Sequence, residues 1–192
     1  MTRSAQLMIG IAMLAGCGGQ TAASRVNGNI DPEIAAYSGL SAAQRKDVAE
    51  LRRVTAPFHQ FDKAVAAGWS TKITACMTDP AGAGGMGFHY GKTALIDGSV
   101  SVDQPELLLY EPEKNGRLEL VAVEYIIPYT AVSRDAAPPV LFGQKFLQND
   151  VFQLWGLHVW AWKHNPSGLF ANWNPRVTCD HTTDVAAAMS HN

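Results

Sequence analysis

Apolar residues recur at helical spacing in the segment that follows residue 40. In Ala42–Val54 they share one face, and Ser41 is of a residue type that caps helix N-termini. Pro57 suits the first turn of a second helix, Pro57–Ala67, and Gly68 suits its C-terminal cap. The sequence therefore predicts a pair of N-terminal helices. The apolar face of the first helix consists of Val48, Leu51 and Val54.

After Trp69 the spacing changes from helical to alternating, which is the pattern of half-buried strands. Glu113–Gly116 predicts a tight hairpin turn between two of them, because Asn-Gly tolerates positive φ. The expected fold class is α+β, with the N-terminal helical pair packed on a mainly antiparallel sheet of four or five strands. The candidate strands are Lys72–Met77, Gly87–Tyr90, Glu106–Tyr110, Arg117–Ile127 and Phe152–Lys163.

Strict alternation places one carboxylate and one histidine on apolar faces of two predicted strands. Glu124 ends an apolar row, and a buried carboxylate is unfavourable unless it is paired, hydrogen-bonded or bound to a metal. His158 lies among aromatic residues and follows Gly156, which leaves room beside it. The two predicted rows are Leu118, Leu120, Ala122 and Glu124, and Leu154, Gly156, His158, Trp160 and Trp162.

Two further histidines complete a candidate site. His89 lies in the glycine-rich segment Gly84–Tyr90, where backbone or ligand can approach closely, and His59 lies on the predicted second helix. With Glu124 and His158 they form a candidate ligand set for zinc, copper or iron. The same groups have two other interpretations. They suit an acid/base pair, or a core network in which histidine only satisfies the carboxylate.

Aromatic residues suggest the walls of a pocket around these groups. Trp160, Trp162 and Tyr90 are the candidate wall residues for a small ligand. The loop Leu169–Pro175 is also rich in aromatic residues. It suits either a lid on the core or a further wall of the pocket.

The cysteines outside the N-terminal segment are Cys76 and Cys179. An even pair in an oxidising compartment favours a disulfide. Two buried thiols and a thiolate metal site are the alternatives.

The N-terminus has the features of an export signal that ends in a lipobox. Arg3 precedes a short apolar run, and Leu14–Cys17 reads Leu-Ala-Gly-Cys. We expect residues 1–16 to be a signal peptide, Cys17 to carry the lipid that attaches the protein to the membrane, and residues 17–40 to be a tether. Gly18 after the cysteine suggests an outer-membrane lipoprotein that faces the periplasm. The alternative is an ordinary signal peptide cleaved nearby.

Charge and length limit the remaining classes of function. Loss of Arg3 with residues 1–16 leaves 14 basic against 17 acidic residues, which offers no electrostatic footprint for nucleic acid. Residues 41–192 suit one domain with a core of its own. The partners expected are the membrane, a metal ion or a small molecule.

Three motifs together resemble a group of uncharacterised secreted bacterial proteins and lipoproteins. They are Gly85–Tyr90, Val123–Tyr125 and Leu157–Pro175, with the last reading LHVWAWKHNPSGLFANWNP. The resemblance implies no activity. Three hypotheses remain open: an envelope protein that binds a metal or small ligand, an enzyme that uses the same groups, and a structural or partner-binding lipoprotein.

Overall fold

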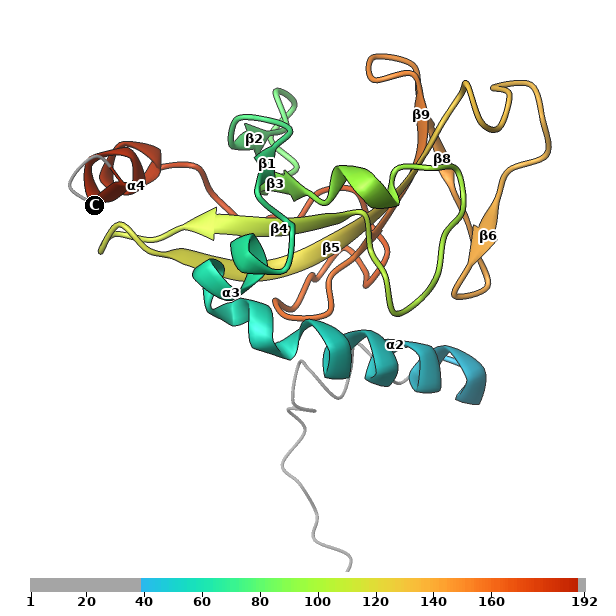
Figure 1. Cartoon of the computed structure of the whole chain (residues 1–192), viewed down its shortest axis with the longest axis horizontal. Helices are drawn as coiled ribbons and strands as arrows, with labels where there is room; N and C mark the ends of the chain where they lie inside the picture. The colour runs from blue at the N-terminus through green and yellow to red at the C-terminus, as the bar shows by residue number, and fades with distance from the viewer. Residues whose placement is uncertain (1–38, 190–192) are drawn as a thin grey trace, which may run out of the picture.

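The structure is a computed structural model that describes residues 39–189 (Figure 1). The expected signal peptide, Cys17 and most of the expected tether lie outside the described residues. Among the residues described, no helix is both long enough and apolar enough to cross a membrane.

The chain has an α+β fold built on an antiparallel sheet. Seven strands form this sheet in the order β1-β3-β4-β5-β9-β8, with β2 also paired to β3. Several of the strands have only two or three residues, which is too short for alternation to be visible in the sequence. The strands are β1 Thr71–Lys72, β2 Met77–Thr78, β3 Gly85–Gly91, β4 Leu107–Pro112, β5 Leu118–Pro128, β8 Leu147–Asn149 and β9 Leu154–Val159. A separate two-stranded sheet pairs β6 Val140–Leu141 with β7 Gln144–Lys145.

Helices α2 and α3 lie on one side of the central strands (Figure 1). Helix α2, Ala42–Thr55, begins with a capping box between Ser41 and Gln44. The expected second helix is interrupted, since a 3₁₀ turn η1, Ala56–His59, precedes a short helix α3, Phe61–Ala66. The interruption falls at Gln60, whose backbone is extended. A second 3₁₀ turn, η2, covers Thr93–Leu95, and a C-terminal helix, α4, covers Thr182–Met189.

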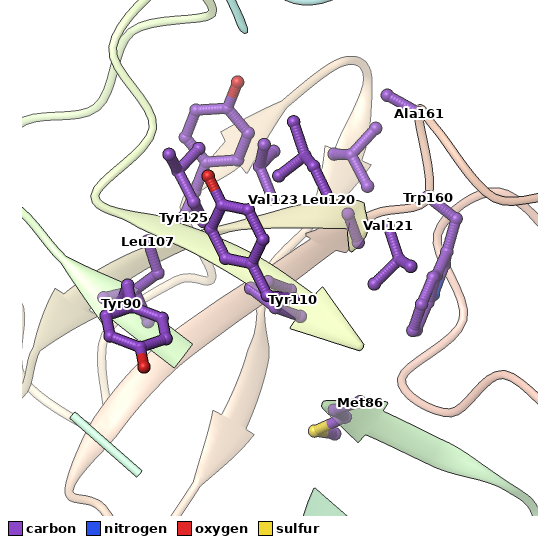
Figure 2. Close-up of a cluster of buried hydrophobic side chains, with 14 of the residues drawn as sticks. Met86, Tyr90, Leu107, Tyr110, Leu120, Val121, Val123, Tyr125, Trp160 and Ala161 are labelled. Atoms are coloured by element: carbon purple, nitrogen blue, oxygen red, sulfur yellow. The ribbon is translucent and has the colours of Figure 1, made fainter. Parts of the chain in front are cut away.

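The main apolar core lies between these helices and the sheet. The Phe61 ring packs edge-on against Tyr90 and Tyr110, and the Tyr110 hydroxyl donates a hydrogen bond to the Phe58 carbonyl. Figure 2 shows a cluster of buried side chains that includes Tyr90, Tyr110 and Tyr125. The helix-covered face of the sheet is therefore packed with apolar and aromatic side chains. The residues that alternate with them along each strand point to the opposite face.

A β-bulge in β5 breaks the alternation that the sequence suggests. Leu109 is opposite Ala122, but Tyr110 is opposite Leu120, so Val121 is an extra residue. Leu120 therefore shares the helix-covered face with Tyr110, whereas Ala122 and Glu124 point to the other face. The prediction that Leu118, Leu120, Ala122 and Glu124 form one row was wrong for this reason.

Two predicted strands are shorter than expected. The segment Lys72–Met77 forms no continuous strand, because residues 73–76 leave the sheet between β1 and β2. The strand expected to reach Lys163 ends at Val159. Beyond it, the Trp160 amide donates to Leu169 and the amides of residues 162 and 163 donate to the Val121 carbonyl at the bulge.

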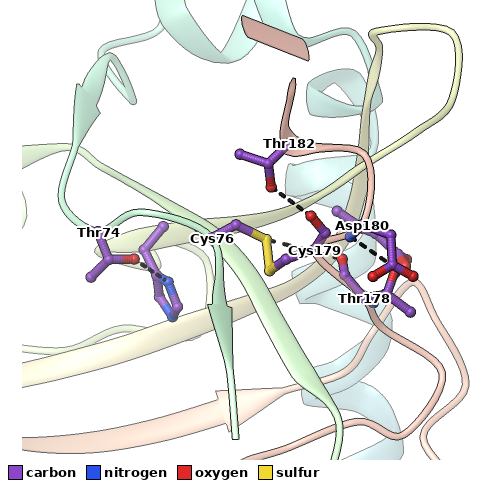
Figure 3. Close-up of a disulfide and its surroundings, with 8 residues drawn as sticks. Thr74, Cys76, Thr178, Cys179, Asp180 and Thr182 are labelled. Atoms are coloured by element: carbon purple, nitrogen blue, oxygen red, sulfur yellow. Dashed lines mark hydrogen bonds between the residues drawn. A yellow bond between two sulfur atoms is a disulfide. The ribbon is translucent and has the colours of Figure 1, made fainter. Parts of the chain in front are cut away.

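A disulfide joins Cys76 and Cys179, as predicted, and their Cα atoms are 5.8 Å apart (Figure 3). It links the segment between β1 and β2 to the loop that precedes α4. That loop also pairs with the start of β3, where Asn174 exchanges backbone hydrogen bonds with Gly85. The C-terminal segment is thus fixed across the face of the sheet that the helices leave open.

Candidate metal centre

Three adjacent parts of the sheet bring His89, Glu124 and His158 together. Glu124 of β5 is directly opposite His158 of β9, and on its other side it is opposite Leu107 of β4. His89 of β3 is opposite Leu109, two residues further along β4. Since residues two apart share a face of a strand, all three side chains point to the face opposite the helices. One ligand atom from each lies within 4.8 Å of the others.

The distances from Glu124 to the two histidines are longer than hydrogen bonds and closer to the spacing of ligands around a metal ion. Glu124 Oε2 is 3.5 Å from His89 Nε2, and Glu124 Oε1 is 3.7 Å from His158 Nε2. Hydrogen bonds of this kind are normally about 2.7–3.2 Å long. Two atoms that each lie about 2.0–2.2 Å from one tetrahedral ion are about 3.3–3.6 Å apart. The contact of Glu124 with His89 falls within this range and its contact with His158 lies just above it, with each histidine facing a different oxygen of the carboxylate.

Gly156 makes room for the carboxylate. A Cβ at this position would lie 2.9 Å from Glu124 Oε1, which is closer than a carbon atom normally approaches an oxygen. Gly156 precedes His158 by two residues and shares its face of β9. The absence of a side chain here lets Glu124 lie between the two histidines.

Thr74 fixes the orientation of His89. Its hydroxyl oxygen is 2.8 Å from His89 Nδ1. This contact fits the tautomer in which Nδ1–H donates to Thr74 and the Nε2 lone pair points toward Glu124, which is the tautomer a metal ligand needs. Thr74 lies near Cys76 in the segment that leaves the sheet (Figure 3). The departure of this segment from strand geometry therefore accompanies the contact of Thr74 with His89.

His158 lies in the site with neither ring nitrogen hydrogen-bonded. Both nitrogens are buried and neither has a partner at hydrogen-bonding distance, while the Asn172 side chain lies close enough to oppose the lowering of the His158 pKa. The ring stacks over Trp160, with a centroid distance of 6.4 Å. A buried polar group without a partner destabilises the fold by about 1–3 kcal/mol, so a closer partner, such as a metal ion, would stabilise this imidazole.

Burial makes all three groups electrically neutral near pH 7. It lowers the pKa of His89 to about 4 and that of His158 to about 3. Burial, with a smaller contribution from the charge of Glu106, raises the pKa of Glu124 to about 8. In the absence of a metal the site therefore holds two neutral imidazoles and a protonated carboxyl group.

A cavity of about 160 Å³ opens beside the three side chains. Its walls are mainly apolar and include Met86, Leu107 and Ile126 from the sheet. Phe152 and Trp173 contribute aromatic surface from the two loops that border the cavity. The aromatic loop Leu169–Pro175 therefore does supply a wall, through Trp173.

The aromatic residues predicted as pocket walls lie elsewhere, and that prediction was wrong. Tyr90 points to the helix-covered face and packs on Phe61. Trp162 donates a hydrogen bond to the Thr55 hydroxyl at the end of α2. Trp160 is buried behind His158 and donates to the Ala171 carbonyl. The strand ends before Trp160, so extending its alternation to residue 162 gave the wrong face.

His59 is not part of the cluster. It lies on η1, where its ring packs edge-on against Trp162 with a centroid distance of 4.3 Å. This contact is on the helix side of the sheet, whereas His89, Glu124 and His158 are on the other side. The prediction for His59 was wrong because the sequence of a helix does not show which side of the sheet the helix will cover.

Three residues at or near the site had no signal that sequence reasoning used. Thr74 and Asn172 border the cavity, and both belong to segments outside the strands. Glu106 is fully buried, accepts a hydrogen bond from the Ile126 amide and, through burial, has its pKa raised to about 8. Its place at the start of an apolar run, Glu106–Tyr110, was the available clue.

No protein-family model, no curated protein and no solved structure matches this chain. The function proposed below therefore rests on the geometry of the site.

Proposed function

We propose that this protein binds one divalent transition-metal ion through His89, Glu124 and His158. The proposal rests on one observation, the state of His158. Its buried ring nitrogens have no partner at hydrogen-bonding distance, and its Nε2 atom lies 3.7 Å from the buried carboxylate of Glu124. A metal ion satisfies this nitrogen, ionises Glu124 and uses the Nε2 atom of His89 that Thr74 leaves available.

The ligand set narrows the choice of metal. Two imidazoles and one carboxylate suit Zn²⁺ and Fe²⁺, and both occur with such sets when coordination positions are left open. Copper, which imidazole also binds, stays within the proposal. The three protein ligands leave at least one coordination position free. This position would face the cavity, because the cavity is lined by all three ligands.

The cellular setting is part of the proposal and rests on the sequence alone. Leu14–Cys17 supports lipid attachment at Cys17, and Gly18 supports residence in the outer membrane, facing the periplasm. The resemblance of the three motifs to those of secreted bacterial proteins supports the same compartment. Under this proposal the metal-binding domain is held at the membrane by the lipid.

Metal analysis of protein purified without a histidine tag tests the proposal. We expect about one equivalent of zinc or iron per chain, and a Co²⁺-loaded form with the visible absorption of a four- or five-coordinate ion. His158→Gln and Glu124→Gln should each abolish stoichiometric binding. His59→Gln is the matched control, since that histidine is on the other side of the sheet, and it should bind metal as the natural chain does. Equal metal content in all four proteins, or none in the natural chain, would overturn the proposal.

A catalytic role is the second candidate function. It is favoured by the open coordination position next to a mainly apolar cavity, because an open position is the arrangement of catalytic zinc rather than structural zinc. Turnover by the metal-loaded protein that is lost in Glu124→Gln and retained in His59→Gln would support it.

A further inference from the structure

We propose that the cavity beside the metal centre receives a small organic acid, with a monoanionic head on the metal and an apolar body of about one ring. This inference rests on the proposed metal site. It adds the chemical class of the ligand.

The volume of the cavity sets the size of the body. At about 160 Å³ it is close to the space that holds a single aromatic ring, since an engineered protein cavity of about 150 Å³ binds benzene. A two-ring body or a long chain would extend beyond the cavity at its exposed side.

The walls set the polarity of the body. Met77, Met86, Leu107, Ile126 and Leu154 line the cavity with aliphatic and thioether groups, and Phe152 lies at its exposed side. Apart from the three metal ligands, no lining residue carries an ionisable side chain. The polar lining residues besides the three candidate ligands are Thr74, Asn149 and Asn172, too few to pair every hydroxyl group of a sugar. An apolar body has no such groups to leave unpaired.

The charge of the loaded site sets the head group. A divalent ion, one ionised glutamate and two neutral metal-bound imidazoles carry a net charge of +1. This charge is enclosed, because His89, Glu124 and His158 are all buried. An uncompensated buried charge is strongly unfavourable, so a monoanion on the open coordination position is favoured over a neutral or dianionic ligand.

Asn172 supplies a polar contact for the head. Its side chain borders the cavity and lies near the His158 ring. The amide N–H can donate to the second oxygen of a carboxylate whose first oxygen is on the metal. A carboxylate therefore fits the site better than a halide or a simple alkoxide.

Benzoate is the probe for this proposal, tested on the full chain loaded with Zn²⁺ for calorimetry or Co²⁺ for spectroscopy. We expect benzoate to change the Co²⁺ spectrum and to bind at least about tenfold more tightly than acetate, because acetate lacks the body that the cavity buries. Benzamide, which has the same shape but no charge, should bind at least about tenfold more weakly than benzoate. Equal affinity for benzoate and acetate, or for benzoate and benzamide, would overturn the proposal.

A pair of neighbouring variants ties the binding to this cavity. Phe152→Ala should weaken benzoate binding about tenfold and leave metal content unchanged, because Phe152 lines the cavity and holds no ligand atom. Val151→Ala is the control, since Val151 is 87 % exposed and does not line the cavity. Benzoate affinity that is the same in both variants would place the probe elsewhere and contradict the proposal.

The two proposals fail in different ways. A chain that binds one metal ion but shows no benzoate response retains the metal centre and overturns the ligand. A chain that binds no metal overturns both.

Discussion

At the scale of single residues, the position of Glu124 depends on what its neighbour lacks. A Gly156→Ala variant would place a methyl group 2.9 Å from Glu124 Oε1. Because that oxygen is at the end of a flexible side chain, we expect the fold to persist while the carboxylate moves and metal affinity falls at least about tenfold. Metal titration and urea unfolding of the same variant separate the two effects.

Gly39→Ala is the matched control for this change, since a Cβ at Gly39 would meet nothing within 4 Å. It should leave both metal affinity and unfolding free energy unchanged. Unchanged metal affinity in Gly156→Ala would show that the position of Glu124 Oε1 is not needed for binding.

The ionisable residues of the site predict how the metal-free protein responds to pH. The pKa values of Glu124 and Glu106 are each raised to about 8 by burial, so their contribution to stability is present below about pH 4.5 and is lost as pH rises toward 8. His89 and His158 have pKa values lowered to about 4 and 3, so the stability that they lose at low pH is regained as pH rises and is nearly complete by about pH 7.5. Between pH 6.5 and 8 the two carboxyl groups dominate, since each histidine adds only about 0.4 kcal/mol over this range.

We therefore expect the unfolding free energy of the metal-free protein to fall between pH 6.5 and 8, by about 1–2 kcal/mol for each carboxyl group. Glu124→Gln removes one of the two groups, so the fall should be about half as large in that variant. Urea unfolding at several pH values measures the effect. A stability that is flat in the natural chain over this range would contradict the buried, protonated state of both groups.

At the scale of elements, the segment between β1 and β2 positions His89. Replacing Thr74 by Val keeps the shape of the side chain but removes the hydroxyl that contacts His89 Nδ1. We expect metal affinity to fall about 10–100-fold, as for other partners of ligating histidines. Thr71→Val, in the exposed strand β1, should have no effect on metal affinity. Equal affinities in the two variants would show that Thr74 does not orient the ligand.

The sequence predicted elements well wherever regular alternation continued without interruption. Glu124 and His158 lie within uninterrupted stretches of β5 and β9, so their side chains reach the same face, as expected. The bulge at Val121 broke the same logic a few residues earlier, and nothing in the run Leu120–Val123 distinguishes a bulge from a regular strand. Alternation reports a local preference, whereas a bulge is fixed by partners elsewhere in the chain.

Tertiary contacts also decided the parts of the site that the sequence did not reveal. Residues 73–76 alternate like a strand but leave the sheet, where Cys76 bonds to Cys179 and Thr74 contacts His89. Asn172 and Trp173 border the cavity because their loop is held in place by distant contacts, such as that of Asn174 with Gly85, whereas Phe152 lies in the short turn between β8 and β9. The pairing of the cysteines was predictable because only two remained outside the lipobox. Its effect on the path of the chain was not.

At the scale of the whole molecule, the lipid on Cys17 remains a prediction. We expect mass spectrometry of the mature protein to find Cys17 at its N-terminus with a lipid attached, and Cys17→Ala to move the protein from the membrane fraction to the soluble fraction. Cys76→Ala breaks the disulfide but leaves the lipobox intact, so that variant should remain with the membrane. An exported protein with an unmodified Cys17 would rule out the lipid.

The three ligands come from strands that are separated widely along the chain. A chain delivered from its N-terminus, through a ribosome or a translocation channel, releases residue 89 first, then residue 124 and only later residue 158. Gly85, just before His89, is bonded to Asn174, so the covering loop is released later still. No earlier length of the chain holds the full set of ligands. Under the proposed function, the metal would therefore be selected by the surroundings in which delivery finishes. A chain exported before it folds would then carry an ion that is available outside the place of its synthesis.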